Sequence, residues 1–321
     1  MENVSVFIGM KEKIKKVTWL RNFLLKIPCL MFMLDPIIPM SYTMKLLYFL
    51  RMEKELNLED PKDFNEKIQW LKVYYRDPLY VKCADKYRVR DYVANLGLGE
   101  ILNDLYKVYD KVEDINFGEL PDRFVMKTNH ACKTIIICDD KSRFNETETK
   151  KKFRRWLKKK HGYTSGEFHY NYIKPLIIVE KNLALEDGTL PVDYKIFCFN
   201  GKPHYIAVYL ERDETTLDPK KRAIFDFEWN PKDFVIPLYS TDTTKIARPK
   251  KLEQMYYIAE QLSKPFPFVR VDLYEINGKV IFGELTFTPT GGFAKGFTNE
   301  CLRKFGDLIS LPPKSKTQEW V

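Results

Sequence analysis

Hydrophobic side chains recur every three or four positions in the first third of the chain. In PKDFNEKIQWLKVYY, residues 61–75, Phe64, Ile68 and Leu71 fall on one face of a helix. The segment DKYRVRDYV, residues 85–93, has the same spacing and predicts a further helix. We therefore expect this part of the protein to be mostly helical.

Later segments show the strand pattern, rich in Val, Ile, Thr and aromatic residues. Strands are expected in RFVMKTNHACKTIIICDD (123–140), PLIIVEKNL (175–183), VDYKIFCFNGKPHYIAVYLE (192–211) and RVDLYEINGKVIFGELTFTPTGG (270–292). The last two contain Asn-Gly, a turn typical of hairpins. Helices are predicted from the N-capping Asn145 to near Gly162 and over residues 250–265. Strands gathered after helices, rather than alternating with them, favour the α+β class.

The order of these elements predicts five parts. They are an N-terminal helical segment (1–55), a helical region (56–120), a small strand-helix-strand lobe (121–183), a larger lobe with the last two hairpins (184–313) and a tail (314–321).

Composition narrows the class of partner. The 321 residues are 45% hydrophobic and carry a formal charge of +9, from 53 Lys and Arg against 44 Asp and Glu. This excess favours an acidic partner: nucleotide phosphate, anionic polysaccharide, nucleic acid or lipid. Nucleic acid is disfavoured because no known binding module occurs and the aromatic residues have core-like spacings. The oligomeric state has no readable signal in the sequence.

The cysteines, the histidines and one apolar segment bear on the compartment and on membrane contact. Six cysteines without a CxxC pair, and four histidines without zinc-ligand spacing, predict neither structural zinc nor a disulfide framework, which fits the cytoplasm. Residues 19–40 are strongly apolar, but Arg21, Lys26 and Asp35 interrupt them, so no membrane span is predicted. A helix packed on the body or on a partner is the favoured interpretation. Peripheral contact with the inner face of a bacterial membrane is the alternative.

Asp272 and Glu284 lie in the two predicted strands of the final hairpin. A three-residue loop, with Gly278 left-handed, would give these acids matching parity and place them on one face. Two neighbouring carboxylates suit a hard cation such as magnesium, which also binds phosphate oxygens. The alternative is two solvated acids on an exposed sheet face.

Several basic residues could accompany this acid pair. Arg270 shares the face of Asp272 and could hold a phosphoryl oxygen or neutralise the acid. Lys127 and Lys195 lie in apolar strands, where inward-pointing lysines would favour phosphate binding, although a strand lysine more often points outward. His130 is either a phosphate contact or a turn residue that satisfies backbone groups.

The motifs together resemble one protein family. DFNEKIQWLK, ADKYRVRDYV, FVMKTNH, DYKIFCFNGKP and FVRVDLYEINGKVIFGELTFTPTGG, within residues 60–312, are similar to the TupA-like ATP-grasp family of teichuronopeptide and capsular polysaccharide biosynthesis. The resemblance implies an ATP-grasp fold with two α+β lobes around a nucleotide cleft, using ATP and Mg²⁺. It also implies activation of a carboxylate as an acyl phosphate, which an amine then attacks.

The resemblance implies roles for particular residues. Cofactor contacts are expected from Lys86, Lys127, His130, Lys133, Asp193 and Lys195, with Glu180, Lys181 and Leu183 at the adenine hinge and Glu186 or Asp187 at the ribose. Arg270 and Lys195 are expected to be catalytic, and Asp272, Glu284 and Thr286 to bind metal. Arg88, Gly291 and Gly292 are expected to contact the substrate.

Two departures from the family pattern bear on activity. Thr286 stands where many ATP-grasp proteins have Asn, which weakens the second magnesium site. The phosphate-covering loop is NHACK rather than glycine-rich, so either Lys133 compensates or ATP turnover is impaired.

The hypothesis is an ATP- and magnesium-dependent ligase that joins an amino acid or amino sugar to a uronic or related acid, free or glycan-linked, in surface-polysaccharide assembly. The alternatives are a glycosyltransferase that uses a sugar nucleotide and a non-catalytic scaffold of the same pathway.

Overall fold

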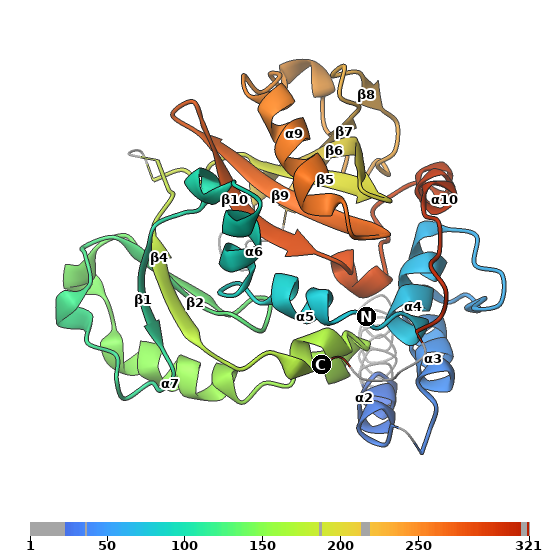
Figure 1. Cartoon of the computed structure of the whole chain (residues 1–321), viewed down its shortest axis with the longest axis horizontal. Helices are drawn as coiled ribbons and strands as arrows, with labels where there is room; N and C mark the ends of the chain where they lie inside the picture. The colour runs from blue at the N-terminus through green and yellow to red at the C-terminus, as the bar shows by residue number, and fades with distance from the viewer. Residues whose placement is uncertain (1–22, 36, 186–187, 213–218, 316–319, 321) are drawn as a thin grey trace, which may run out of the picture.

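The computed structural model describes residues 23–35, 37–185, 188–212, 219–315 and 320. Within these ranges the strands form two antiparallel sheets, one of four strands and one of six. Figure 1 shows the smaller sheet at the left and the larger one at the upper right, with helices α5 and α6 between them. The α+β class and the helical N-terminal region expected from the sequence are confirmed.

Seven of the described strands fall in the predicted segments, but Leu105–Tyr109, Pro219–Phe225 and Pro231–Lys232 were not predicted. The first of these lies in the region 56–120 that was expected to be helical, and it joins the sheet of the small lobe. The smaller sheet has the order β1–β4–β2–β3, where β1 is Leu105–Tyr109, β2 Phe124–Thr128, β3 Ile135–Cys138 and β4 Ile177–Lys181. The larger sheet has the order β10–β9–β5–β6–β7–β8, where β5 is Asp193–Phe199, β6 Lys202–Arg212, β7 Pro219–Phe225, β8 Pro231–Lys232, β9 Phe268–Ile276 and β10 Lys279–Thr286.

The helices are α2 Lys26–Met33, α3 Met40–Met52, α4 Phe64–Tyr74, α5 Pro78–Ala84, α6 Val89–Asn95, α7 Glu146–Leu157, α8 Gly162–Ser165, α9 Leu252–Ser263 and α10 Asn299–Leu308. Four of them, α4, α5, α7 and α10, begin at a side-chain cap. Asp63 and Glu66 form a capping box at the start of α4, and the Asn145 side chain accepts a hydrogen bond from the backbone N–H of Glu148 at the start of α7.

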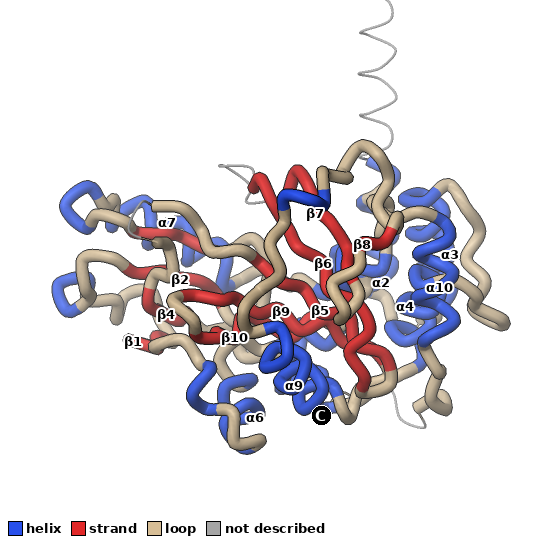
Figure 2. Tube along the Cα trace, turned by 90° about the horizontal axis from the view of Figure 1, so that it is seen from above, coloured by secondary structure: helices blue, strands red, loops and turns tan. Residues whose placement is uncertain are grey.

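Each sheet buries one face under a helix. In the small lobe, Phe153 of α7 belongs to the same core as Phe124 and Met126 of β2. In the large lobe, α9 lies along the sheet, as Figure 2 shows, and the Cys198 Sγ of β5 contacts the carbonyl oxygen of Ala259 at 3.9 Å. Since side chains alternate along a strand, the polar residues between these core positions face the opposite side.

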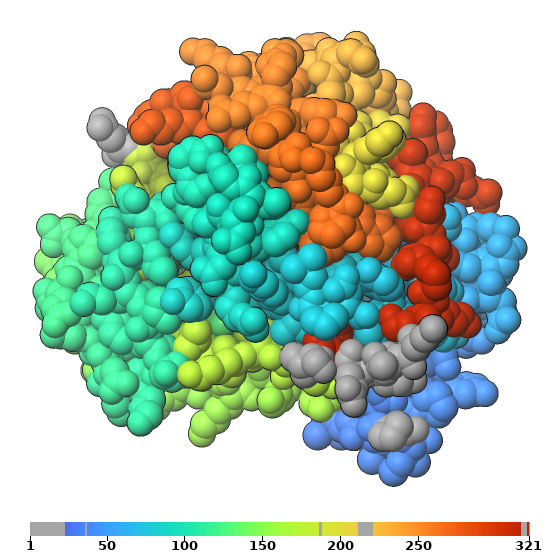
Figure 3. All heavy atoms as spheres, viewed as in Figure 1, coloured from blue at the N-terminus to red at the C-terminus, as the bar shows by residue number. Residues whose placement is uncertain are grey.

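The first third of the chain completes the large lobe. Phe64 of α4 packs its ring against Phe268 of β9 and Phe305 of α10, with centroids 5.0 and 5.7 Å apart. In Figure 3 the cyan and teal segment from α4 to α6 runs across this face of the molecule from one lobe to the other. The described helices include none that is both long and apolar enough to cross a membrane.

Candidate active site

The hairpin of β9 and β10 differs from the expected three-residue loop. Its turn has two residues, Asn277 and Gly278, both left-handed with φ of 50° and 73°, and Ile276 pairs with Lys279. With this turn alone, Asp272 and Glu284 would not lie opposite each other in the two strands. A bulge between Phe282 and Glu284 inserts one residue and brings Glu284 directly opposite Asp272. The predicted pairing of the acids is therefore present, but by a different mechanism.

Gly283 makes this bulge sterically feasible. A Cβ atom at this position would lie 3.0 Å from the carbonyl oxygen of Asp272 and 3.1 Å from the Tyr274 ring. A side chain would push the two strands apart at the point where the two carboxylates face each other. The residue that precedes Glu284 is thus part of the geometry of the acid pair.

Asp272 is buried between two cations. Arg270 donates from Nε and Nη2 to its two carboxylate oxygens at 2.6 Å each, and Lys195 Nζ lies 2.5 Å from Oδ2. Asp193 lies 2.8 Å from the same lysine. Burial opposes the charge of Lys195, but the two aspartates outweigh it and raise the pKa of the lysine. The pKa of Arg270 is raised for the same reason, by Asp272.

Glu284 is the more accessible acid, with 39% of its side chain exposed. It accepts a hydrogen bond from Thr286 Oγ1 at 2.8 Å and lies 3.4 Å from Arg270. Burial favours the neutral form, but Lys86, Arg270 and Lys195 outweigh it and lower the pKa of Glu284 to about 2. This carboxylate is therefore ionised at neutral pH and faces the cavity between the lobes.

A cavity of about 360 Å³ lies between the two lobes and is lined by both. From the large lobe it receives Lys195, Asp272 and Glu284. From the small lobe and its neighbours it receives Lys86, Arg90, Lys127, Lys133, Glu180, Lys181 and Leu183. Lysines from two sheets and a pair of facing carboxylates therefore converge on one space of ligand-binding size.

Lys127 and Glu180 form an ion pair in the small-lobe wall, with Nζ and Oε2 2.6 Å apart. They lie on adjacent strands, because β2 pairs with β4 and Val125 lies opposite Glu180. Arg90 approaches the other oxygen of Glu180 at 3.9 Å. Lys127, which was expected to bind phosphate, and Glu180, which was expected to bind adenine, thus contact each other.

The NHACK loop covers one side of the cavity. Lys86 Nζ donates to the carbonyl oxygen of Ala131 at 3.2 Å, which anchors the loop to the helical region. Lys133 has a left-handed φ of 56°, a conformation that glycine adopts more easily. The loop thus has a glycine-like bend without a glycine, and the Lys133 side chain lines the cavity.

Other predicted residues lie elsewhere. Arg88 is exposed and does not line the cavity, because α6 begins there and its face turns outward. His130 is buried, with no hydrogen-bond partner among the described residues at either ring nitrogen, and it too lies outside the cavity lining. Glu186 and Asp187 lie outside the described residues.

Gly291 and Gly292, which were expected to contact the substrate, lie in the loop after β10. Both are buried, and their carbonyl oxygens accept hydrogen bonds from Gln69 Nε2 of α4 at 3.2 and 2.7 Å. A Cβ on Gly292 would lie 2.7 Å from the same nitrogen. These glycines are needed because the loop after β10 packs closely on α4.

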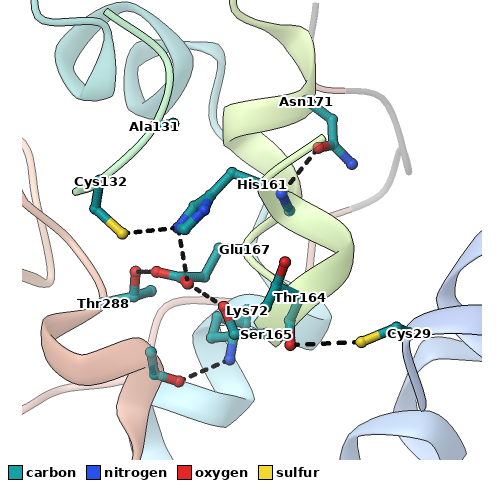
Figure 4. A network of polar contacts seen from close by, with 12 residues as sticks. Cys29, Lys72, Ala131, Cys132, His161, Thr164, Ser165, Glu167, Asn171 and Thr288 are labelled. Carbon is teal, nitrogen blue, oxygen red and sulfur yellow. Dashed lines mark hydrogen bonds and ion pairs between the residues drawn. The ribbon is translucent and has the colours of Figure 1, made fainter. Parts of the chain in front are cut away.

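A buried polar network was missed by the sequence analysis (Figure 4). Glu167 accepts hydrogen bonds from the hydroxyls of Ser165 and Thr288, and His161 Nε2 lies 3.9 Å from its Oε2. His161 Nε2 also lies 3.4 Å from Cys132 Sγ in the NHACK loop. The network thus connects the loop over the cavity with the loop after β10.

Lys72 of α4 belongs to this network. It is 4% exposed, and its Nζ donates to Gln69 Oε1 at 2.7 Å and to the Gly291 carbonyl at 2.8 Å. Burial lowers the pKa of Lys72 to about 7. Burial favours the neutral form of Glu167, but Lys72 and His161 outweigh it and lower the pKa of that carboxyl. No single sequence motif marked these residues, because they come from distant segments.

The donor set at Asp272 and Glu284 fits one hard cation. Magnesium commonly takes one or two carboxylates together with phosphate oxygens, so it does not need a complete protein cage. The described residues contain no group of three or more His, Cys, Asp or Glu side chains that would form one. Asp272 Oδ1 accepts one bond from Arg270, which leaves it a further acceptor site.

Two α+β lobes around a cavity with lysines and facing carboxylates are the arrangement expected of an ATP-grasp protein. The sequence profile of the TupA-like ATP-grasp family matches residues 66–310, and the chain belongs to this family. No curated protein sequence matches it.

Solved structures with a similar fold include other ligases. D-alanine–D-alanine ligase from Bacillus anthracis has a TM-score of 0.42 and 18% identity, over 76% of this chain and 68% of that one. Phosphoribosylamine–glycine ligase from Thermotoga maritima has a TM-score of 0.40 and 12% identity, over 67% and 50%. D-cycloserine synthetase DcsG has a TM-score of 0.40 and 14% identity, over 72% and 70%.

Proposed function

We propose that this protein is an ATP- and magnesium-dependent carboxylate–amine ligase. The observation that carries the proposal is the convergence of Lys127, Lys195, Asp272 and Glu284 on one cavity between the lobes. In this proposal Lys86, Lys127 and Lys133 contact phosphates, while Lys181 and Leu183 line the nucleotide end. Arg270 and Lys195 neutralise charge that develops during phosphoryl transfer.

The proposed reaction has two steps. A carboxylate oxygen of the acid attacks the γ-phosphorus of ATP, so that an acyl phosphate forms and ADP leaves. The amine then attacks the acyl carbon, phosphate leaves, and the nitrogen loses a proton to give an amide. Bound at Asp272 and Glu284, with Thr286 beside them, magnesium would supply charge neutralisation for the phosphates.

Phosphoryl transfer needs little covalent chemistry from this protein. Lys195 and Arg270 are held rigidly by Asp272, so their positive charges are already oriented before substrate binds. Because Glu284 is ionised throughout the neutral range, it needs no proton release before it can bind a cation. Preorganised charge is therefore the main catalytic contribution that we assign to the large lobe.

The test is an assay of ADP release with ATP, magnesium and a panel of uronic acids paired with amino acids and amino sugars. We expect release with at least one pair and loss of at least 100-fold in Glu284→Gln, since one oxygen ligand of the metal is removed. Glu300→Gln, an exposed acid of α10, is the matched control. Absence of both nucleotide binding and ADP release in the wild type would refute the proposal.

A glycosyltransferase is the alternative with the same acid pair, which would then hold metal against a sugar-nucleotide diphosphate. Thermal-shift measurements separate the two, because the ligase should be stabilised by ATP with magnesium and not by UDP-sugars. A scaffold without catalysis predicts stabilisation by neither, and full pathway function of Asp272→Ala in cells.

The setting we propose is bacterial surface-polysaccharide assembly, in the cytoplasm beside the inner membrane face. Membership of the TupA-like ATP-grasp family, which takes its name from teichuronopeptide biosynthesis, supports this pathway. Exposed large apolar side chains on α2, α3 and their connection support the membrane contact: Phe23, Ile27, Leu30, Met33, Leu34, Ile37, Tyr42 and Phe49. These helices form the lower right corner in Figure 3.

Membrane contact is tested by co-sedimentation with vesicles of phosphatidylglycerol or phosphatidylcholine. We expect binding to the anionic vesicles and its loss in the double variant Leu30→Glu, Ile37→Glu, because charged side chains would oppose insertion. Leu238→Glu is the control, since this leucine is also exposed but lies in the large lobe. Binding unaffected by the double variant, or absent in the wild type, would contradict the contact.

A further inference from the structure

A second cavity lies on the large lobe. Its volume is about 230 Å³. Its walls come from β5–β7 and from the loops that follow β8 and β10: Phe197, Tyr209, Arg222, Tyr239, Pro289, Thr290, Phe293, Ala294, Lys295, Gly296 and Phe297. Two cations and several aromatic rings line it, and no acidic residue does.

Arg222 is held at this cavity by rings rather than by an acid. Its guanidinium carbon lies 5.2 Å from the ring centroid of Tyr209, 4.9 Å from that of Tyr239 and 5.7 Å from that of Phe297. Its Nε is buried and has no hydrogen-bond partner. Among the described residues no carboxylate pairs with it, which is unusual because buried arginine groups normally have partners.

The backbone around Arg222 is shaped for this arrangement. A Cβ on Gly296 would lie 3.0 Å from the guanidinium, so a side chain at this position would require the arginine to shift. The Arg222 backbone N–H donates to the carbonyl of Tyr239 at 2.8 Å, which fixes the second ring. The arginine is thus positioned by its surroundings, with its Nε donor unpaired.

Tyr209 of the second cavity links it to Lys195 of the first. On the sheet, Tyr209 pairs with Asp193 on one side and with Arg222 on the other. Lys195 Nζ also lies 5.2 Å from the Tyr209 centroid. Lys195 Nζ and the Arg222 guanidinium carbon, each 5.2 Å from the Tyr209 centroid, therefore lie at most about twice that distance apart. This separation is comparable with the size of one sugar.

We propose that this second cavity binds an anionic group of the acid substrate, distinct from the carboxylate that becomes activated. Arg222 would pair with that group, a carboxylate or a phosphate, and Tyr209 and Tyr239 would pack against the ring that carries it. This inference rests on the proposed ligase activity. It narrows the substrate to a ring-containing acid with two anionic groups.

The experiment measures binding of D-glucuronate, D-glucose 1-phosphate and neutral D-glucose by saturation-transfer NMR, with a non-hydrolysable ATP analogue and magnesium present. We expect at least tenfold tighter binding of one or both anions than of glucose in the wild type, as for one charge-assisted hydrogen bond. The anion that binds more tightly identifies the carboxylate or the phosphate. Arg222→Gln should lose the preference, whereas Arg248→Gln, an exposed arginine outside both cavities, should keep it.

The proposal is overturned if the wild type shows no preference for either anion or if Arg222→Gln retains it. Should Arg222→Gln fail to fold, Arg222→Lys decides: weakened anion binding supports the role of the guanidinium, and unchanged binding overturns it. Binding of the ATP analogue is measured separately. If the wild type does not bind the ATP analogue, the ligase proposal fails. If it binds the analogue but shows no preference for either anion, only the second-cavity proposal fails.

Discussion

Asparagine in place of Asp272 should destabilise the protein far more than glutamine in place of Glu284. The first change leaves Arg270 and Lys195 as buried cations, since their side chains are only 10% and 11% exposed. Removing one partner of a buried ion pair costs about 3–5 kcal/mol. Lys195 keeps Asp193 at 2.8 Å and Arg270 keeps Thr286 at 3.0 Å, so we expect the lower end, about 3 kcal/mol.

Glu284→Gln should cost less than about 1 kcal/mol, because the side chain is 39% exposed and its ion pair with Arg270 is partly solvated. The measurement is urea unfolding of the nucleotide-free variants at pH 7, followed by circular dichroism. The double variant Asp272→Asn, Arg270→Gln should lose less stability than the sum of its single changes, because the unpaired cation is also removed. Equal stability losses for Asp272→Asn and Glu284→Gln would refute the reasoning.

Three further predictions concern the bulge, the small lobe and the buried lysine. Gly283→Ala should destabilise the protein by about 1–3 kcal/mol in urea unfolding, because the added Cβ would contact the facing strand. It should also weaken magnesium-dependent nucleotide binding. If stability and binding are both unchanged, the bulge has no such role. Lys127→Met should weaken ATP binding about tenfold or more in calorimetry, whereas the exposed Lys107→Met should not. The pKa of Lys72 is lowered to about 7, so between pH 7 and about 8.5 the unfolded chain holds a proton that the folded chain releases. Stability of the wild type relative to Lys72→Met should therefore rise over this range, and a flat difference would contradict the lowered pKa.

Local pattern predicted most of the hairpins and the helices α4, α6, α7 and α9, but not β1, β7, β8 or α10. The Asn-Gly turns at residues 200–201 and 277–278 and the cap at Asn145 depend on neighbouring residues, which sequence shows directly. The facing of Asp272 and Glu284 was also predicted. Its cause was not, because a bulge depends on the close approach of the opposite strand rather than on turn composition.

Residues that meet only through tertiary packing were harder to predict. Lys72, Glu167 and Thr288 come from three distant segments, and each alone resembles an ordinary surface residue. The motif that contains Arg88 matched the family, but side-chain direction depends on where α6 begins. No sequence pattern marked Arg222, because what distinguishes it is that none of the described carboxylates pairs with it.

The contact between α4 and α10 has a consequence for biosynthesis. Besides the Phe64 and Phe305 rings, the backbone N–H of Ser315 donates to the Tyr74 carbonyl at 2.8 Å. Phe64 of α4, which is translated early, already meets Phe268 of β9, but the part of its cover that Phe305 supplies is added only when α10 has left the ribosome. A nascent chain stalled before residue 299 should therefore expose part of this aromatic core.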